Sequence, residues 1–380
     1  MRINFLLPFY PKLPIGGFKV HYECANRLAE RGHSVSVLHP CTVEEPTGWK
    51  ANLSRTGKLA VDFLSNQETV GWYPLRNEVQ LLSVADLSER NVPAADITLA
   101  TSWATAEMAR SYTSKVGEVF QIVYDYELWM TANADLRQRM EAAFRATKNC
   151  IATSPSVAAM LREIGVQPVA YIPCGLDLGE FGIDTPIESR LPESIGFPAR
   201  EQSSKGTADA VKAVEILRSR GPQSLRVSAF GPRRVNGLPD DVRVEWSPNS
   251  RQLRAFYNSI SIFVFPSHFE GWGLPGMEAL ACGAALVAAD SVGIRDYACH
   301  EETALMVPRG RPDLLAVAIE RLIEDRELRI RLAGQGEAKV RQFTWEPAVD
   351  ALEALLERSA TARALNESAQ REELRCSLSR

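Results

Sequence analysis

Long hydrophobic runs are missing from this sequence of 380 residues. No stretch approaches the roughly 18 consecutive apolar residues that mark a membrane-spanning helix. The segment Met1–Tyr10 has one arginine and a short apolar run, but Pro8 and Pro11 interrupt it and no small-residue cleavage site follows. It therefore predicts a buried first strand rather than a signal peptide. Peripheral association with a membrane stays open.

Cysteine motifs are missing as well. The seven cysteines stand at wide, irregular spacings, with no Cys-x-x-Cys pair and no cluster with histidine. A disulfide framework or a zinc site needs such spacings, so the sequence argues against both. Dispersed thiols in an odd number are typical of a reducing compartment, and we expect a cytoplasmic protein.

A strong charge of either sign is also absent. The chain has 43 Lys and Arg against 47 Asp and Glu, and its formal net charge is −4. Nucleic-acid-binding proteins present a basic surface to the phosphates, so this class of partner is not expected.

The sequence does contain a repeated alternation of short apolar runs and amphipathic helical windows, which is typical of parallel α/β sheets. Proline and glycine break the alternation once near the middle, and the length fits two domains. A less regular stretch from Glu44 to Glu68 is interpreted as an insertion. The expected parts are an N-terminal Rossmann-like domain at 1–172, a linker at 173–192, a C-terminal domain at 193–346, an amphipathic helix at 347–359 and a polar, fraying tail at 360–380.

The most informative segment is HFEGWGLPGME, from His268 to Glu278, which follows a predicted strand and begins a predicted helix. Its glycines let backbone amides approach a ligand, and the helix N-terminus offers free N–H groups with a partial positive charge. These groups suit a diphosphate and sugar hydroxyls, with Glu270 and Glu278 facing one crevice. The alternative is a glycine-rich turn whose glutamates meet solvent. We favour a binding site because two glutamates, an aromatic pair and a proline occupy specific offsets.

This segment resembles the E-x7-E signature of the retaining glycosyltransferases of family 4. These enzymes have the GT-B architecture, two Rossmann-like domains with a donor cleft between them. The resemblance continues in Ala279–Ala289, Ile172–Asp177 and Phe343–Trp345. The last helix of the family crosses back to the N-terminal domain, which predicts the same for 347–359. Val292–Asp296 departs from the family, which usually has Gly-Gly-x-x-Glu there.

The resemblance implies roles for individual residues. Arg200 and Lys205 match the basic pair of the family, and preorganised cations would stabilise the charge that develops on a leaving diphosphate. Glu270 would bind sugar hydroxyls, and Glu278 the ribose. The implied donor-binding residues are Gly16, Gly17, Gly273, Leu274, Gly276, Glu278 and Trp246.

A polar and aromatic segment follows another predicted strand. Many family members have His-Asp there, whereas this chain has Tyr124-Asp125, followed by Tyr126 and Glu127. The pattern is similar to a subgroup with Q-D-Y-E that includes bacterial rhamnosyltransferase-like enzymes. The resemblance thus implies four catalytic residues, Arg200, Lys205, Glu270 and Asp125. Asp125 would contact the donor sugar or the acceptor. Trp246 either stacks on the nucleobase or belongs to the core.

The function implied by the resemblance is retaining transfer of a sugar from a nucleoside diphosphate to a small-molecule or cell-surface glycan acceptor. The alternatives are a non-catalytic nucleotide-sugar-binding subunit and a nucleotide-sugar epimerase of the same architecture. No cofactor beyond the co-substrate and no metal are expected. The chain has no Asp-x-Asp pair, and only Asp125 and Glu127 imitate one, two positions apart on an expected strand. These two carboxylates are better interpreted as hydrogen-bond acceptors for sugar or acceptor hydroxyls.

Overall fold

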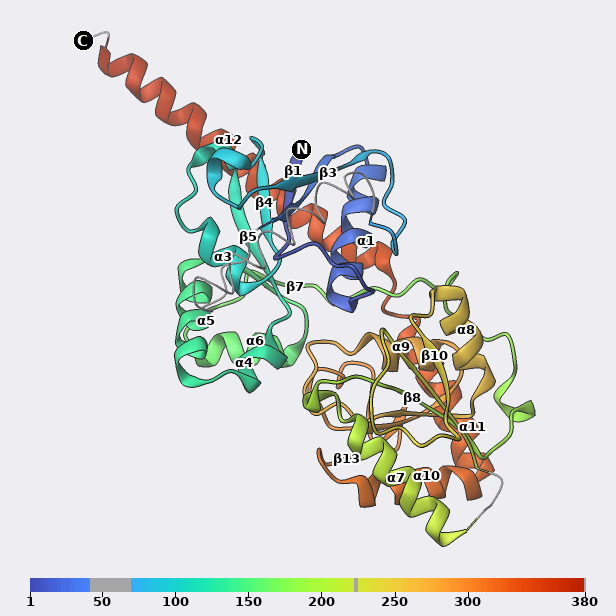
Figure 1. Cartoon of the computed structure of the whole chain (residues 1–380). Helices are drawn as coiled ribbons and strands as arrows, with labels where there is room; N and C mark the ends of the chain where they lie inside the picture. Colours follow the sequence, from blue (N-terminus) through green and yellow to red (C-terminus); the bar gives the residue numbers. More distant parts are fainter. Residues whose placement is uncertain (42–69, 222–224, 379–380) are drawn as a thin grey trace.

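The computed structural model describes residues 1–41, 70–221 and 225–378. The insertion expected between Glu44 and Glu68 lies outside these residues. Within them the chain forms two α/β domains, drawn one above the other in Figure 1, and a long last helix returns from the second domain to the first.

The N-terminal domain is built on a parallel sheet of seven strands in the order β3-β2-β1-β4-β5-β6-β7. The order 3-2-1-4-5-6 is that of the Rossmann fold, with β7 added at one edge. Its strands are β1 (Arg2–Leu6), β2 (Ser34–Pro40), β3 (Val79–Val84), β4 (Ile97–Ala100), β5 (Glu118–Val123), β6 (Asn149–Ala152) and β7 (Ala170–Tyr171). Its α-helices are α1 (Gly16–Glu30), α3 (Trp103–Ala109), α4 (Tyr126–Thr131), α5 (Ala134–Ala146) and α6 (Pro155–Glu163), with 3-10 turns at Glu89–Asn91 and Ser114–Val116.

The C-terminal domain repeats this order in a six-stranded parallel sheet, β10-β9-β8-β11-β12-β13. Its strands are β8 (Ser194–Pro198), β9 (Arg226–Gly231), β10 (Arg243–Trp246), β11 (Ile262–Phe265), β12 (Ala285–Ala289) and β13 (Ala304–Val307). Its helices are α7 (Thr207–Arg220), α8 (Ser250–Ser259), α9 (Leu274–Ala281), α10 (Pro312–Glu324), α11 (Arg326–Val340) and α12 (Trp345–Leu378), with 3-10 turns at Ile187–Ser189 and Ser203–Lys205. Two Rossmann-like domains are therefore confirmed.

Local sequence explains why these elements form. Central strands such as β11 (IFVF) and β12 (ALVAA) are buried throughout, as expected when helices cover both faces of a parallel sheet. Helix α8 begins with a capping box, in which Asn249 accepts a hydrogen bond from the amide of Gln252 and the Gln252 side chain accepts one from the amide of Asn249.

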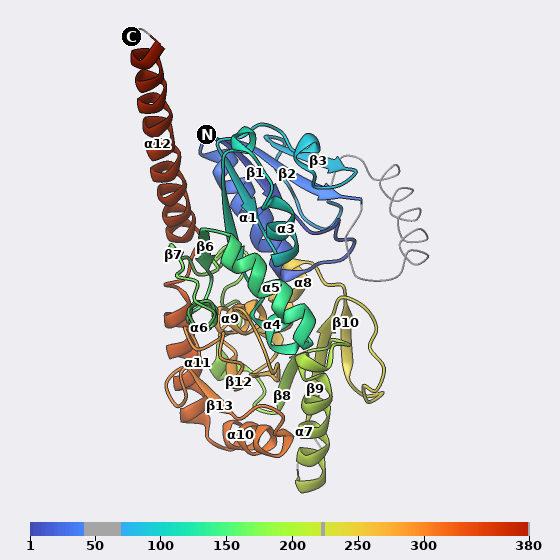
Figure 2. The same cartoon turned by 90° about the vertical axis from the view of Figure 1, so that its left-hand side faces the viewer.

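The last helix, α12, crosses back to the N-terminal domain, as the resemblance implies. Trp345, Val349, Leu352 and Leu356 are buried in one core cluster with residues of α1 and β1. Figures 1 and 2 show α12 leaving the C-terminal domain, passing along the N-terminal domain and projecting beyond it. The helix ends at Leu378, so it continues through the region where the sequence predicts a fraying tail.

Among the described residues, no helix has both the length and the apolar character needed to cross a membrane.

Candidate active site

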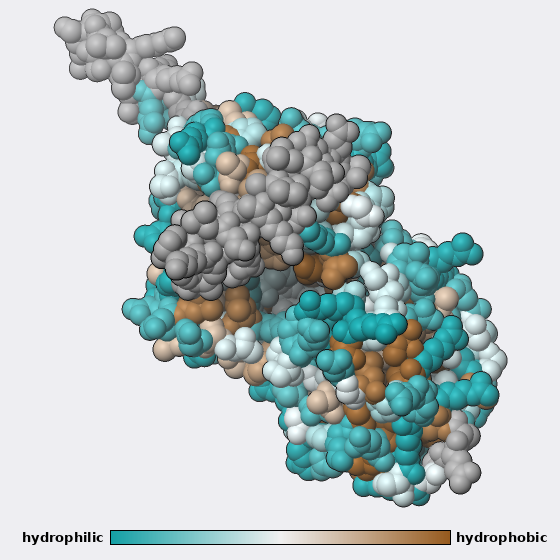
Figure 3. Space-filling model, in the orientation of Figure 1, coloured by the Kyte–Doolittle hydropathy of each residue, from teal (hydrophilic) through white to brown (hydrophobic). Residues whose placement is uncertain are grey.

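The candidate site lies where the two sheets face each other. Gly16 follows β1, Arg200 follows β8 and Glu270 follows β11, each at the carboxyl end of its strand. In both sheets the strand order reverses beside the first strand of the domain, and open α/β sheets bind ligands at this position. Figure 3 shows the surface hollowed between the two domains.

Two helix N-termini meet at this place. Helix α1 begins at Gly16 and α9 at Leu274, and a Cβ atom added to Gly16 would lie 3.4 Å from Cδ1 of Leu274. Within the part of the chain that the structure describes, no side chain caps either N-terminus. The first amides of a helix have no acceptor within it and carry a partial positive charge, so two uncapped N-termini together favour an anion.

The glycines of the α9 turn have separate structural reasons. Gly273 has φ +85°, a conformation that favours glycine, and its carbonyl accepts a hydrogen bond of 2.6 Å from the Tyr297 hydroxyl. A Cβ on Gly276 would lie 2.8 Å from that hydroxyl, which explains the second glycine. The amide of Gly276 donates to the Gly273 carbonyl. Three amides are expected to hold the donor. Those of Gly273 and Leu274 precede the first hydrogen bond of the helix, whereas the amide of Gly276 already donates to a carbonyl of the protein.

Glu278 is buried inside the C-terminal domain, with two polar groups beside it. The hydroxyl of Tyr257 donates to Oε2 of Glu278 at 3.0 Å, and Nζ of Lys19 lies 4.0 Å from Oε1. Burial raises the pKa of Glu278, while Lys19 and the Tyr257 hydrogen bond oppose this shift. Lys19 belongs to the N-terminal domain and also pairs with Glu180 at 2.9 Å, so it bridges the two domains.

Lys205 forms a second bridge between the domains. Its Nζ lies 3.0 Å from Oε1 of Glu270 and 2.5 Å from Oε2 of Glu127 in α4. The hydroxyl of Ser204 donates to the other oxygen of Glu127 at 2.7 Å. Burial lowers the pKa of Lys205, but Glu270 and Glu127 more than compensate and raise it.

The glycine that follows Lys205 fixes this loop. Gly206 has φ +66°, and a Cβ on it would lie 2.2 Å from the carbonyl oxygen of Pro266, the residue after β11. The amide of His268 also donates to the carbonyl of Ser204 at 2.7 Å. The loops that carry Lys205 and Glu270 are therefore held together.

Arg200 stands on the same side of the C-terminal sheet. Its guanidinium lies 5.6 Å from the ring centroid of Phe230, and among the described residues no carboxylate forms an ion pair with it. Burial lowers the pKa of Arg200, and the nearby Tyr257, Glu270 and Glu278 oppose this shift. A half-buried guanidinium without a carboxylate partner is suited to an anionic ligand.

Asp125 has a structural contact that the sequence did not predict. Its Oδ2 accepts a hydrogen bond of 2.9 Å from the amide of Trp103, the first residue of α3. Burial raises the pKa of Asp125 to about 7, and the Trp103 amide opposes this shift. One carboxylate oxygen thus caps α3, and a contact of Asp125 with a sugar stays a prediction.

The expected placement of Asp125 and Glu127 on one strand is wrong. Strand β5 ends at Val123, and Glu127 lies in the first turn of α4. Their carboxylates have different partners, Trp103 for one and Lys205 with Ser204 for the other. The pair therefore does not imitate an Asp-x-Asp cation site.

Trp246 and Val292 line the ends of two strands. The ring of Trp246 packs against Gly231, where an added Cβ would lie 2.9 Å from it, and is only partly buried against the core of the C-terminal domain.

Val292 has φ +66°, an unfavourable conformation for a β-branched residue, at the position where the family usually has glycine. Val292 also pairs with Glu270 in an isolated bridge, so this loop supports the backbone of Glu270.

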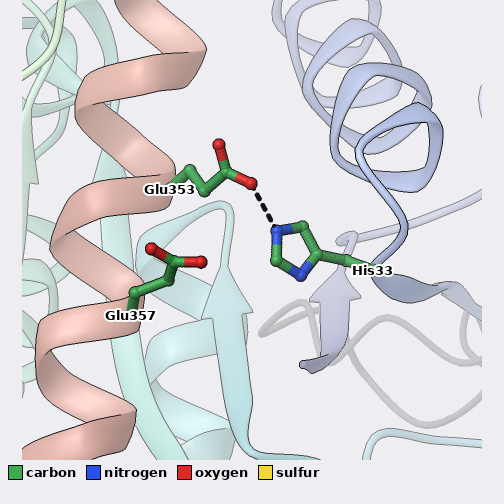
Figure 4. Close-up of side chains that lie close together, drawn as sticks. All are labelled: His33, Glu353 and Glu357. Atoms are coloured by element: carbon green, nitrogen blue, oxygen red, sulfur yellow. Dashed lines mark hydrogen bonds and ion pairs between the residues drawn. The ribbon is translucent and has the colours of Figure 1, made fainter.

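One other cluster has the composition of a metal site. His33, Glu353 and Glu357 bring their ligand atoms within 4.8 Å of one another between the α1–β2 turn and α12 (Figure 4). However, Nε2 of His33 is hydrogen-bonded to Glu353 at 2.6 Å and Nδ1 lies 3.1 Å from the amino group of Met1. Arg31 also pairs with Glu353 at 2.7 Å. The polar contacts of this cluster attach α12 to the N-terminal domain.

Sequence reasoning missed two residues of the site, Lys19 and Tyr257. Lys19 lies in the first helix, just after the glycine pair, a placement that could have indicated a cation beside the donor. Glu127 was expected as a hydrogen-bond acceptor for sugar or acceptor hydroxyls, and in the structure its carboxylate binds Ser204 and Lys205. Tyr257 carried no signal, because it occupies an ordinary buried position of α8.

The sequence and the fold are both similar to those of known proteins. Residues 192–339 match the family model described as "Glycosyl transferases group 1". A D-inositol 3-phosphate glycosyltransferase from Jonesia denitrificans is 31% identical over 228 residues, 53% of this chain and 54% of that protein. The chain thus spans about half the length of the curated relatives that it matches.

Two solved structures resemble the whole chain. Sucrose-phosphate synthase from Thermosynechococcus elongatus gives a TM-score of 0.69 at 18% identity, covering 95% of this chain and 99% of that one. HepE from Anabaena, solved in complex with UDP and glucose, gives 0.70 at 15% identity, covering 94% and 100%. The chain therefore has the GT-B fold, and its C-terminal domain matches the group 1 glycosyl transferases.

Proposed function

We propose that the protein is a glycosyltransferase that moves a sugar from a nucleoside-diphosphate donor to an acceptor, with retention of the anomeric configuration. The observation that carries the proposal is the set of positive groups at the domain boundary. Arg200, Lys205 and the N-termini of α1 and α9 lie together, beside the two glutamates of the E-x7-E segment.

The chemistry needs this arrangement. Cleaving the bond between the sugar and the diphosphate builds negative charge on the leaving group, and preorganised cations and amides stabilise that charge. In the proposed pose Glu270 binds sugar hydroxyls and Glu278 binds the ribose. The group 1 match of residues 192–339, and UDP and glucose bound to HepE, support a nucleotide sugar as the donor.

Binding and transfer assays are needed to identify the nucleobase, the sugar and the acceptor. A thermal-shift screen of UDP, GDP, dTDP and ADP identifies the base. Sugar conjugates of the stabilising nucleotide are then tested, rhamnose and glucose included, because the Q-D-Y-E resemblance points to rhamnose. Transfer with the same anomeric configuration supports the proposal. Epimerised donor without acceptor identifies an epimerase, and binding without any turnover identifies a non-catalytic subunit.

The basic pair provides the sharpest test. We expect Lys205→Met and Arg200→Met each to lower kcat by about a hundredfold, the size typical of losing one group that stabilises a developing charge. Nucleoside binding should weaken far less, because the charge is greatest in the transition state. Lys212→Met is the matched control, since Lys212 is exposed on α7 and pairs with Glu215. Near-normal steady-state turnover of both site variants would contradict the assignment.

A further inference from the structure

Lys205 has two carboxylate partners that belong to different domains. Glu270 comes from the same domain as Lys205, whereas Glu127 comes from α4 of the N-terminal domain. One ammonium group thus faces two carboxylates, at 2.5 Å and 3.0 Å from its nitrogen.

This arrangement conflicts with the function proposed above, on which the inference rests. A diphosphate that binds at Lys205 brings further negative charge to a cation already surrounded by two carboxylates. Like charges at contact distance in a half-buried site repel strongly. At least one carboxylate must therefore leave Lys205 when a diphosphate arrives.

The two carboxylates differ in exposure, in the packing of their backbone and in the domain that carries them. Glu270 lies in a loop whose backbone pairs with Val292, and its side chain is 13% exposed. A Cβ added to Gly293 would lie 2.0 Å from the carbonyl oxygen of Glu270, so this backbone is closely packed. Glu127 is 28% exposed, and its carboxylate is bound only from the other domain, by Ser204 and Lys205, among the hydrogen bonds and ion pairs of the described residues.

We propose that the diphosphate of the donor displaces Glu127 from Lys205, so that the contact of Glu127 across the domain boundary and donor binding exclude each other. Glu127 is then a positioning residue. It holds Lys205 and the two domains together until the diphosphate replaces it, and it sets how tightly the donor binds.

Isothermal titration calorimetry tests the exchange. UDP, GDP, dTDP and ADP are titrated into the wild-type protein, and the nucleotide that binds is then titrated into Glu127→Gln, together with inorganic pyrophosphate as a probe of the anion alone. We expect Glu127→Gln to bind the nucleotide and pyrophosphate about two- to fivefold more tightly, the size of a partly exposed ion pair. Ser204→Ala, which loosens Glu127 but keeps its charge, should shift the affinity the same way by a smaller factor.

A matched control removes the effect of net charge. Glu141→Gln makes the same change at a carboxylate that pairs with Arg145 within α5, and its affinity should equal that of the wild type. In a Lys205→Met background Glu127→Gln should no longer tighten binding.

Two results would overturn the exchange. One is that Glu127→Gln binds the nucleotide and pyrophosphate no more tightly than the wild type does. The other is that Glu127→Gln increases the affinity by the same factor in the Lys205→Met background. If none of the four nucleotides binds to the wild-type protein, the proposed function itself fails.

Discussion

At the scale of single residues, the two glutamates of the E-x7-E segment have different surroundings. Glu278 is buried, hydrogen-bonded to Tyr257 and close to Lys19. Glu270 lies in the preceding loop, paired with Lys205. Although the two glutamates are only eight positions apart, Glu278 is buried against Tyr257 of α8 and Glu270 lies in a loop beside Lys205, which fits contacts to different parts of a nucleotide sugar.

We therefore expect the two glutamates to respond differently to substitution. Glu278→Ala should weaken the binding of free nucleoside diphosphate by about tenfold, since hydrogen bonds to a charged group contribute about 1.5–3 kcal/mol. Glu270→Ala should leave that affinity within about threefold and lower kcat for sugar transfer, because its expected partner is the sugar. Calorimetry and steady-state kinetics on both variants provide the measurement. Identical effects on nucleotide affinity would contradict separate roles.

Sequence and resemblance brought together Arg200, Lys205, Glu270 and Glu278, because each lies in a motif with fixed neighbours. They could not reveal which side chains of the site form hydrogen bonds and ion pairs with one another. Lys19 and Glu127 reach the site from the other domain, and such contacts depend on how the domains pack. Asp125 illustrates the same limit, since its bond to the Trp103 amide joins residues that follow two different strands.

At the scale of elements, the hydrophobic pattern of the sequence predicted the first part of α12 but not its continuation. Its first turns carry an apolar stripe, and residues 347–359 were predicted as a helix on that basis. Beyond Ser359 the apolar stripe is missing and the sequence is polar, so a fraying tail was expected. Alanines and charged residues with high helix propensity, such as Ala362, Arg363 and Ala364, explain why the helix nevertheless continues.

The stability contributed by α12 should come from its buried turns. Leu352, which is 2% exposed, packs with Trp345 and Ala348 around a small cavity against the N-terminal domain. Leu352→Ala should cost about 2–5 kcal/mol, the usual range for a buried leucine, and lower the Tm measured by calorimetry.

Two controls separate this effect from the projecting part of the helix. Leu365→Ala, at a side chain that is 66% exposed, should change stability by no more than about 0.5 kcal/mol. Deletion of residues 365–380 should leave the Tm unchanged. A deletion as damaging as Leu352→Ala would show that the outer turns also stabilise the fold.

At the scale of the whole molecule, the presence of two parallel α/β domains was accessible from the sequence, because alternating apolar runs and amphipathic helices specify parallel sheets. The bridges between the domains were not accessible. Lys19 extends from the N-terminal domain to Glu180 and Glu278, and Lys205 extends from the C-terminal domain to Glu127. Each domain thus places a lysine at the boundary, which brings positive charge to the cleft from both sides.

This distribution of charge leads to the prediction that transfer needs no divalent metal. A cation in a sugar transferase neutralises the diphosphate, and here Arg200, Lys205 and the N-termini of α1 and α9 offer positive potential to the same group. Asp125 is bound to the amide of Trp103, and Glu127 lies in α4 rather than on one strand with Asp125, so the two carboxylates do not form a pair that would hold a hard cation. The measurement is transfer activity after exhaustive EDTA treatment, with magnesium and manganese added back. We expect the activity to survive EDTA within about twofold, since preorganised protein groups already stabilise the leaving group. If it vanishes and returns with a metal, the protein cations do not suffice and a carboxylate of the cleft must bind the ion.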